Sequence, residues 1–418
     1  MEQRGTVFGW RAAKDEERRT MHSIKTGGKP LRAIGLMSGT SMDGIDVALI
    51  DTDGDTLVER GPSFTYPYSR EFRSQLVRGI EDSKAILRRQ DRPGRLRLLE
   101  QYLTELHAEA VAHFLTDCQL QRADVHVIGF HGHTVLHKLQ RFALDVPDYK
   151  LGVPEIVKAW DQRMLTVQIG DGRRLAALTG IDVVYDLRAR DCEMGGQGAP
   201  LVPVYHRAVT AGMEQRPVAI LNVGGVANVT WIGRDGRLIA FDVGPGSALI
   251  DDWMASRRGE PMDRDGACAR EGKVDHDALH ALMRNPFFKT LPPKSLDRNA
   301  FDVASIEQLS TEDGAATLTA FTVNAVARSR EHFPEEPQLW VVTGGGRRNK
   351  ILMATLAGHM AGAVVPAEAV GLDGDALEAE AWAYLAVRSL AGHPITYPTT
   401  TGVREAACGG VVARAAMG

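Results

Sequence analysis

Apolar and polar positions along the chain form short hydrophobic runs separated by turns of small residues. A run from Ile34 passes through Ser38-Gly39-Thr40-Ser41 and resumes over Ile45–Ile50. Two β-type runs around such a turn predict a hairpin. The Asp-Gly pair at 53–54 marks the next turn, and residues 56–59 are the third strand of this predicted unit.

The same order recurs in the second half of the chain. Residues 219–223 form an apolar run, Gly224-Gly225 the turn, and 226–232 the returning run. Asp235-Gly236 and residues 238–241 then repeat the second turn and the third strand. Chance is the alternative for so short a match, but the shared order favours two similar α/β domains that face each other across a cleft.

The remaining segments alternate between predicted helices and strands, as is typical of an α/β fold. Apolar spacing predicts helices at about 71–88, 96–118, 311–331, 350–361 and 374–390, and strands at 125–130, 183–186 and 339–343. We expect residues 138–163 to be an added segment of irregular and helical character.

These elements divide the chain into an extension and two domains. Residues 1–30 are polar and charged, which predicts a disordered N-terminal extension. We expect residues 31–205 together with 400–418 to form the first domain and 206–399 to form the second.

Composition narrows the class of protein. The 418 residues are 44% apolar and 24% charged, as in a soluble globular protein, and the net charge of −4 gives no general attraction to nucleic acid or acidic membranes. Four separated cysteines without a CxxC pair argue against a zinc site and favour a reducing cytoplasm. We expect no membrane span, because no apolar stretch reaches the ~20 residues required, and no secretory signal.

Glycine-rich turns follow three predicted strands, at Gly39, at Gly224-Gly225 and at Gly344-Gly345-Gly346. Glycine lets the backbone approach a ligand, and the hydroxyls beside Gly39 add donors. Asp43 and Asp46 add carboxylates, and this set suits a phosphate chain with its metal ion. An ordinary hairpin whose Ser and Thr satisfy their own turn is the alternative.

The third turn continues through Asn349 into a helix, whose N-terminus suits a nucleoside and its α-phosphate. The chain has no GxxxxGK[ST] motif and no GxGxxG that opens a helix, which argues against P-loop enzymes and Rossmann dehydrogenases.

Asp242 is the candidate for catalysis. It ends a predicted strand and precedes a Gly-Pro-Gly turn, where a carboxylate can take a proton from water or a hydroxyl while the turn holds the substrate. The alternative is an N-cap for the helix predicted from residue 249, which the intervening turn fits poorly.

Polar residues at other strand ends are candidates for substrate binding. His131 and His133 suit substrate hydrogen bonds better than metal ligation, because no carboxylate lies near them in sequence. Asp186 and Arg188 fit either a structural ion pair or contact with an anionic substrate. Gln197 in GGQGAP fits either the cleft wall or an inter-domain hinge.

Several motifs together resemble the 1,6-anhydro-N-acetylmuramic acid kinase family. They run in order from about residue 33 to 405: GLMSGTSMDGID (35–46), HGHT (131–134), TVQIGD (166–171), DLR and GGQGAPLVP (186–203), LNVGGVANVT (221–230), FDVGPG (241–246), TGGGRRN (343–349) and TTTGVRE (399–405).

This resemblance implies two duplicated actin-like (ribonuclease H-like) domains with a central ATP cleft. It also implies ATP and Mg²⁺ as cofactors, a homodimer, and a cytoplasmic role in peptidoglycan recycling. The family hydrolyses the 1,6-anhydro bond and phosphorylates O6, with the aspartate of FDxGPG, here Asp242, as general base.

The residues and the resemblance together predict two binding sets. The cofactor set is Gly39, Thr40, Ser41, Met42, Asp43, Gly44, Ile45, Asp46, Gly224, Gly225, Gly344, Gly345, Gly346 and Asn349. The substrate set is His131, Thr134, Asp186, Arg188, Gln197, Gly244 and Gly246, and no protein ligand to a metal is predicted.

The chain departs from the family pattern at His133, where HGQT is usual, at Ser247, where Asn is usual, and over 294–299, where KSTGRE is usual. These departures concern the fit of the sugar. Two other functions are the alternatives: another small-molecule kinase on the same fold, or a nucleotide-gated binding protein.

Overall fold

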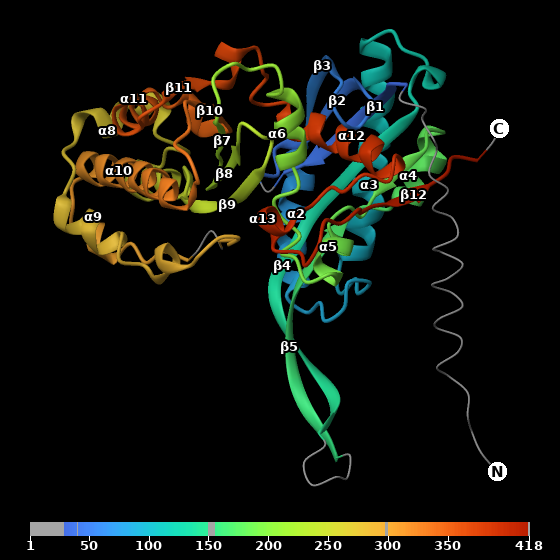
Figure 1. The fold of residues 1–418 in the computed structure, drawn as a ribbon, viewed down its shortest axis with the longest axis horizontal. Coiled ribbons are helices and arrows are strands. Elements are labelled where there is room, and N and C mark those ends of the chain that lie inside the picture. Colours follow the sequence, from blue (N-terminus) through green and yellow to red (C-terminus); the bar gives the residue numbers. More distant parts are fainter. Residues whose placement is uncertain (1–28, 40, 149–154, 297–299, 417–418) are drawn as a thin grey trace.

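The computed structural model describes residues 29–39, 41–148, 155–296 and 300–416, with the side chains of 141–161 outside the description. Thr40 and nearly all of the extension predicted over 1–30 therefore lie outside the described residues. Figure 1 shows two lobes, each built on one β-sheet.

The first sheet has the strand order β12-β6-β4-β1-β2-β3, and β5 pairs with β4. Its strands are β1 (Leu31–Ser38), β2 (Gly44–Thr52), β3 (Val58–Pro67), β4 (Val127–Asp148), β5 (Glu155–Ile169), β6 (Val183–Tyr185) and β12 (Val411–Ala413). β1, β2 and β3 form an antiparallel meander, and β4 and β6 continue the sheet in parallel from β1.

The second sheet has the order β11-β10-β7-β8-β9. Its strands are β7 (Val218–Val223), β8 (Val226–Ile232), β9 (Leu238–Pro245), β10 (Leu339–Thr343) and β11 (Ala363–Pro366). β7, β8 and β9 form the meander, and β10 and β11 add in parallel. Because order and direction match those of β3-β2-β1-β4-β6, the predicted duplication is confirmed.

Helices cover both sheets. The first lobe contains α2 (Arg70–Ser83), α3 (Leu96–Asp117), α4 (Gly172–Thr179) and α5 (Ala189–Glu193), and α6 (Pro203–Val209) leads to the second. The second lobe contains α7 (Ala248–Arg258), α8 (Ala267–Glu271), α9 (His276–Leu282), α10 (Thr311–Ser329) and α11 (Lys350–His359), and α12 (Leu377–Leu390) and α13 (Pro398–Thr401) follow. In the described part of the chain, no helix is long and apolar enough to cross a membrane.

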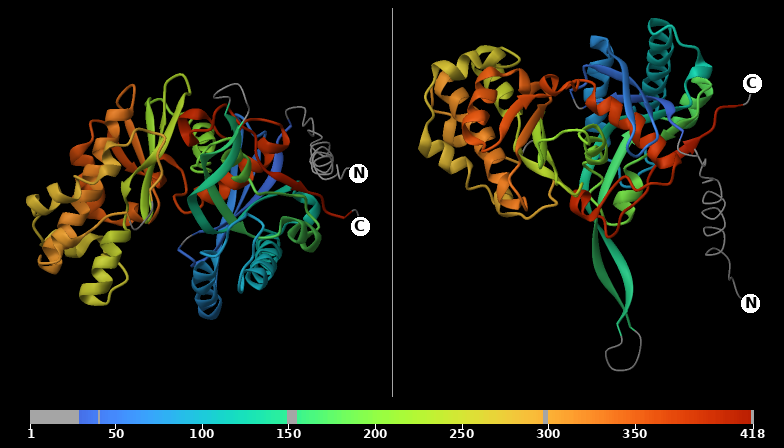
Figure 2. Two further views of the ribbon diagram at one scale, coloured as in Figure 1. Left: turned by 90° about the horizontal axis from the view of Figure 1, so that it is seen from below. Right: turned by 45° about the horizontal axis from the view of Figure 1, so that its top comes forward.

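The prediction of irregular and helical character is wrong over 138–148 and 155–163, and residues 149–154 lie outside the described residues. β4 and β5 continue as one antiparallel ribbon, paired from His133 opposite Ile169 to Asp148 opposite Glu155, and the ribbon extends away from the first lobe (Figure 1, Figure 2). Local spacing did not indicate this pairing because the hydrogen bonds of a strand come from a partner elsewhere in the chain.

α12 packs against the first sheet, where it contacts β1, β2 and β4. The range 206–399 predicted for the second domain is therefore wrong for this helix. Gly35 and Gly129, paired across β1 and β4, make the contact possible. A Cβ at Gly35 would lie 1.7 Å from the carbonyl oxygen of Ala379, and one at Gly129 would lie 1.9 Å from that of Trp382.

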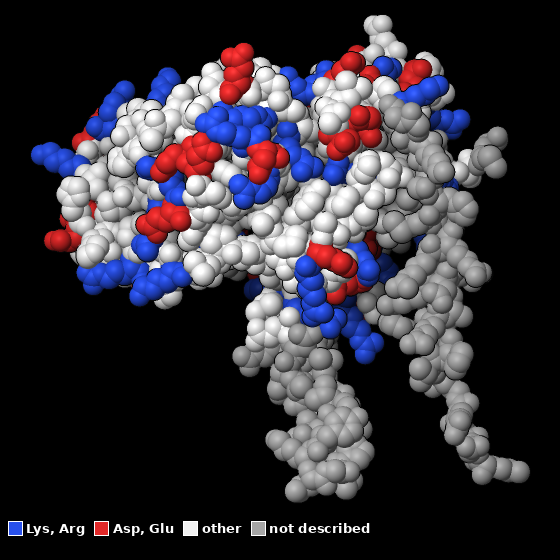
Figure 3. All heavy atoms as spheres, in the orientation of Figure 1, with Lys and Arg blue, Asp and Glu red and all other residues white. Residues whose placement is uncertain are grey.

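The core of the molecule lies between the two sheets. Its buried side chains come from α12 and from the facing sides of both sheets, among them Ala33, Trp382 and Ile220. Alternate residues of β1 and β7 point the other way, into separate cores on the outer faces. Figure 3 shows acidic and basic side chains intermingled on one face of the molecule.

Gly129→Ala is expected to destabilise the protein by about 1–3 kcal/mol, because the new methyl group must push the α12 backbone off the sheet. Urea unfolding measures the change. Gly212→Ala is the matched control, since nothing lies within 4 Å of a Cβ there, and it should shift stability by less than about 0.5 kcal/mol. Equal midpoints for the two variants would contradict the packing argument.

Candidate active site

A cavity of about 490 Å³ lies between the two lobes. Gly39 after β1, Gly224 and Gly225 after β7, and Gly344 and Gly345 after β10 all line it. The structure thus brings the three predicted glycine turns together: the turns after the equivalent strands β1 and β7 line the cavity from opposite lobes, and β10 is paired beside β7.

The third turn lies directly against the second sheet's first strand. Thr343 is paired with Asn222, and the next residue, Gly344, has φ of +75°. A Cβ at Gly344 would meet the Asn222 side-chain oxygen at 2.4 Å and the Val223 carbonyl oxygen at 2.7 Å. Both the backbone angle and the close approach require glycine here.

The first turn is closed by its own groups. The Met42 N–H donates to the Gly39 carbonyl at 3.1 Å, and Met42 has φ of 54°. The Ser41 hydroxyl donates to Asp43 at 2.6 Å, so Asp43 holds the turn. Gly44 and Ile45 are buried at the start of β2.

Three carboxylates, Asp46, Asp375 and Glu378, line the cavity, and Asp375 is paired with Arg347. Burial raises the pKa of Asp46 to about 6. The Thr65 hydroxyl, which donates to Asp46 at 2.6 Å, opposes this shift, and the charge of Asp43 adds to it. Burial also raises the pKa of Glu378; Arg188 opposes this shift and Asp46 adds to it. Asp46 and Glu378, which have no arginine fork of their own in the described part of the chain and repel each other, fit a divalent cation.

Arg188 brings a half-buried cation to the cavity wall. Its Nε donates to His131 Nε2 at 3.0 Å and its Nη1 to the Gly198 carbonyl at 2.8 Å. The guanidinium lies 5.1 Å from the centre of the Trp382 ring, on which His131 also stacks. Burial lowers the pKa of Arg188 to about 10, so it remains a cation at neutral pH.

His131 is neutral, and both of its ring nitrogens are hydrogen-bonded. Its Nδ1 lies 2.9 Å from the Gly132 carbonyl and therefore carries the proton, while Nε2 accepts from Arg188. Burial, followed by the charge of Arg188, lowers the pKa of His131 well below its usual value. With both nitrogens used, this geometry does not favour metal ligation at His131.

His133 lies beneath the first turn and not in the cavity wall. Its Nδ1 is 3.0 Å from the Ser38 hydroxyl, which also accepts from the Tyr68 hydroxyl at 2.7 Å. His133 is fully buried, and burial lowers its pKa to about 4. This departure from the family pattern therefore supports the base of the hairpin.

Asp242 lies beside the segment 293–296, outside the lining of the 490 Å³ cavity. Its backbone N–H donates to the Lys294 carbonyl at 3.0 Å, and its carboxylate accepts from the Leu296 N–H at 2.7 Å. Burial raises the pKa of Asp242 to about 7, opposed by the Leu296 hydrogen bond and by Lys294. Gln197 donates to the Pro293 carbonyl at 2.9 Å, so it contacts the same segment from the first lobe.

Several predicted site residues have structural contacts of their own. Asp186, whose φ is 56°, pairs with Arg89 at 2.5 Å and not with Arg188. Asn349 caps α11 by accepting from the Ile351 and Leu352 N–H groups, which occupies the helix N-terminus that the sequence suggested for an anion.

The glycines beside Asp242 and in the third turn are also closely packed. A Cβ at Gly244 would lie 2.5 Å from the Ala325 methyl, one at Gly246 would lie 2.0 Å from the Gly224 carbonyl, and one at Gly346 would lie 2.4 Å from Val223. Thr134 does line the cavity, where it accepts from the Gln168 amide at 3.1 Å.

The sequence did not identify all of the cavity wall. Ser38, one of the predicted hydroxyl donors, lines it, and so do His137, Thr166, His206, Asn222, Gly374, Asp375 and Glu378, which were not predicted to. Thr166 begins the TVQIGD motif and Glu378 lies on a predicted helix, but neither position indicated that the side chain lines the cavity. The missing signal was the packing of α12 on the first sheet, which carries Glu378 into the cavity.

Two duplicated lobes around a cavity edged by three glycine turns are the architecture of the actin and hexokinase class. The family model for anhydro-N-acetylmuramic acid kinase matches residues 31–415. The chain belongs to this family.

Proteins of that name support the assignment. The anhydro-N-acetylmuramic acid kinase of Methylobacterium nodulans is 49% identical over 395 residues, which cover 92% of this chain and 100% of the relative. Those of Brucella canis and Paramagnetospirillum magneticum are 48% and 49% identical and cover 92% and 90% of this chain and 98% of their own length.

Solved structures align more distantly. The ROK hexokinase from Thermus thermophilus aligns with 85% of this chain and 100% of its own, at 14% identity and a TM-score of 0.37. Component A of the Acidaminococcus fermentans (R)-2-hydroxyglutaryl-CoA dehydratase aligns with 85% of this chain and 99% of its own, at 11% identity and a TM-score of 0.44.

His133→Leu is expected to lower the free energy of unfolding by about 1–3 kcal/mol and to weaken ADP binding, because Ser38 loses a buried hydrogen-bond partner beneath the first turn. Urea unfolding and titration calorimetry measure the two effects. His133→Gln keeps an amide group that can bond Ser38 and should stay within about 1 kcal/mol of wild type. A leucine variant that equals the glutamine variant in both measurements would show that the bond does not matter.

Proposed function

We propose that the protein hydrolyses the 1,6-anhydro bond of 1,6-anhydro-N-acetylmuramic acid and phosphorylates O6 with ATP. The products are N-acetylmuramic acid 6-phosphate and ADP, in peptidoglycan recycling. The observation that carries the proposal is Asp242, whose pKa of about 7 suits a general base at neutral pH, in a chain of this family.

In the proposed reaction, Asp242 takes a proton from water as the water oxygen attacks C1 of the sugar. The C1–O6 bond breaks, and O6 attacks the γ-phosphorus of ATP, so that ADP leaves. The backbone N–H groups of the turns at Gly39, Gly224 and Gly344 bind the phosphates, since all three turns line one cavity.

Asp46 and Glu378 are the residues that would hold Mg²⁺, directly or through water. When bound, the ion neutralises charge on the phosphates during transfer. The raised pKa values of both carboxylates and their mutual repulsion support this assignment.

In this proposal the sugar binds between the first-lobe wall of the cavity and the segment 293–296, which contacts both Gln197 and Asp242. Arg188 is the cation that faces the lactyl carboxylate, held in place by His131 and the Trp382 ring. Thr134 offers a hydroxyl on the same wall, and Gln197 holds the segment that contacts Asp242. The homodimer and the cytoplasmic location are supported by the family resemblance, and light scattering of the purified protein tests the first.

Asp242→Asn is expected to reduce sugar-dependent ADP release by about 10²–10⁴-fold, because the amide cannot accept the proton. A coupled ADP assay with anhydro-N-acetylmuramic acid measures it, and plain hexoses should give no release. Asp235→Asn, at an exposed aspartate, is the control and should keep wild-type turnover. Near-full turnover in the Asp242 variant would refute the role.

Incorporation of ¹⁸O from labelled water at C1 separates this reaction from that of another small-molecule kinase, which would leave C1 unlabelled. A nucleotide-gated binding protein would bind ATP without sugar-dependent ADP release.

The rate should depend on pH through Asp242. The base acts when deprotonated, and its pKa is raised to about 7, so kcat/KM should rise about tenfold per pH unit below pH 7 and level off above it. Initial rates between pH 5 and 9 measure this. A profile that levels off near pH 4, the ordinary range of an aspartate, would contradict the assignment.

A further inference from the structure

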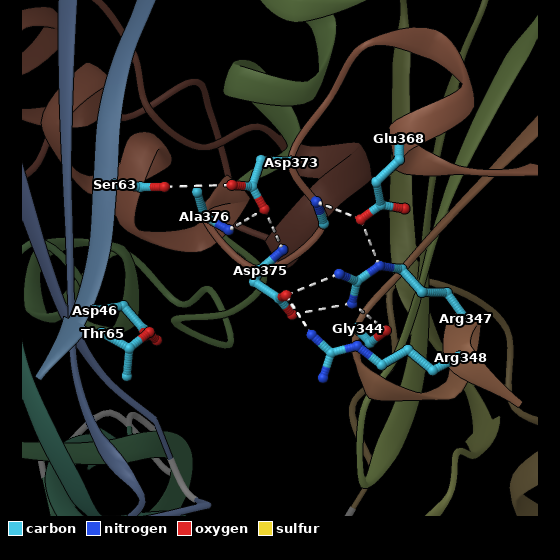
Figure 4. Close-up of polar contacts among 11 residues, drawn as sticks. Asp46, Ser63, Thr65, Gly344, Arg347, Arg348, Glu368, Asp373, Asp375 and Ala376 are labelled. Carbon is cyan, nitrogen blue, oxygen red and sulfur yellow. Dashed lines mark hydrogen bonds and ion pairs between the residues drawn. The ribbon is translucent and has the colours of Figure 1, made fainter. Parts of the chain in front are cut away.

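A single buried guanidinium joins two walls of the cavity (Figure 4). The Arg347 side chain is 5% exposed, and its Nη1 donates to the Gly344 carbonyl of the third turn at 2.9 Å. The same group binds Asp375 as a two-pronged fork, with Nη1 3.0 Å from Oδ1 and Nη2 2.9 Å from Oδ2. Its Nε donates to Glu368 at 2.8 Å.

Asp375 belongs to the segment that leads into α12. It lines the cavity with Gly374, and Glu378 follows three residues later on the helix. Asp373 accepts from the Asp375 and Ala376 N–H groups, and the Ser63 hydroxyl of β3 donates to it at 3.2 Å. The segment 373–376 is therefore bound to the first sheet on one side and to Arg347 on the other (Figure 4).

The fit around Arg347 is close. A Cβ at Gly374 would lie 2.4 Å from Arg347 Nε, so the guanidinium rests against the backbone at this point. Arg348 also pairs with Asp375, at 2.5 Å, but its side chain is 67% exposed. A planar fork can bind Gly344, Asp375 and Glu368 together, whereas a lysine ammonium cannot reproduce that geometry.

We propose that Arg347 is a positioning residue that holds the Gly344–Gly345 turn against the start of α12, and so sets the width of the nucleotide-binding part of the cavity. The proposal rests on the proposed function in that the turn binds nucleotide. Arg347 acts through Gly344 and Asp375, and the effect should appear in nucleotide affinity and not in sugar affinity.

The test measures ADP binding by titration calorimetry without sugar, together with KM for ATP and KM for the anhydro-sugar. Arg347→Lys keeps the charge and should weaken ADP binding and raise KM for ATP by tenfold or more, with KM for the sugar changed less than twofold. Gly374→Ala leaves every charge in place, displaces the guanidinium, and should reproduce this pattern. Arg348→Lys is the matched control and should change ADP affinity less than twofold.

Wild-type ADP affinity in Arg347→Lys would overturn the proposal. Equal losses of ADP and sugar affinity, with a lowered unfolding midpoint, would also overturn it, because a general loss of structure would then explain the result. If wild type binds ADP but does not turn over the anhydro-sugar, the proposed function fails while the binding comparison still decides the role of Arg347.

Discussion

The structure depends on the close contact between α12 and the first sheet. Gly35 and Gly129 remove the two side chains that would otherwise stand between β1, β4 and the helix backbone. The helix has small residues at this contact, such as Ala379 and Ala383, so the helix backbone packs almost directly on the strand backbone. Because α12 also borders the core between the sheets, its position fixes how the two lobes meet.

The chemistry of the cavity follows from that helix. α12 carries Glu378 to the cavity wall and Trp382 beneath it, and the Trp382 ring supports both His131 and Arg188. The start of α12 is linked to the third glycine turn through Asp375 and Arg347. One helix thus connects the parts of the cavity to which the proposed reaction assigns the phosphates, the sugar and the nucleoside.

The surrounding protein raises the pKa values of the carboxylates that the proposed reaction uses. Asp46, Glu378 and Asp242 all have raised pKa values because the surrounding protein desolvates them, and among the described residues none is bound by a fork of an arginine of the kind that lowers the pKa of Asp375. Asp186 also has a raised pKa, but it is paired with Arg89 and holds the structure, whereas Asp46, Glu378 and Asp242 are assigned to the cation and to proton transfer.

The sequence by itself determined the duplicated strand order, the three glycine turns and the candidate base, because hydrophobic alternation and glycine follow from local backbone geometry. Only the tertiary structure decided that α12 belongs to the first sheet and that β4 and β5 form a long ribbon. It likewise assigned Asp186 to Arg89 and Asn349 to a helix cap, and placed Glu378 in the cavity. These outcomes depend on partners distant in the chain, which local spacing cannot specify.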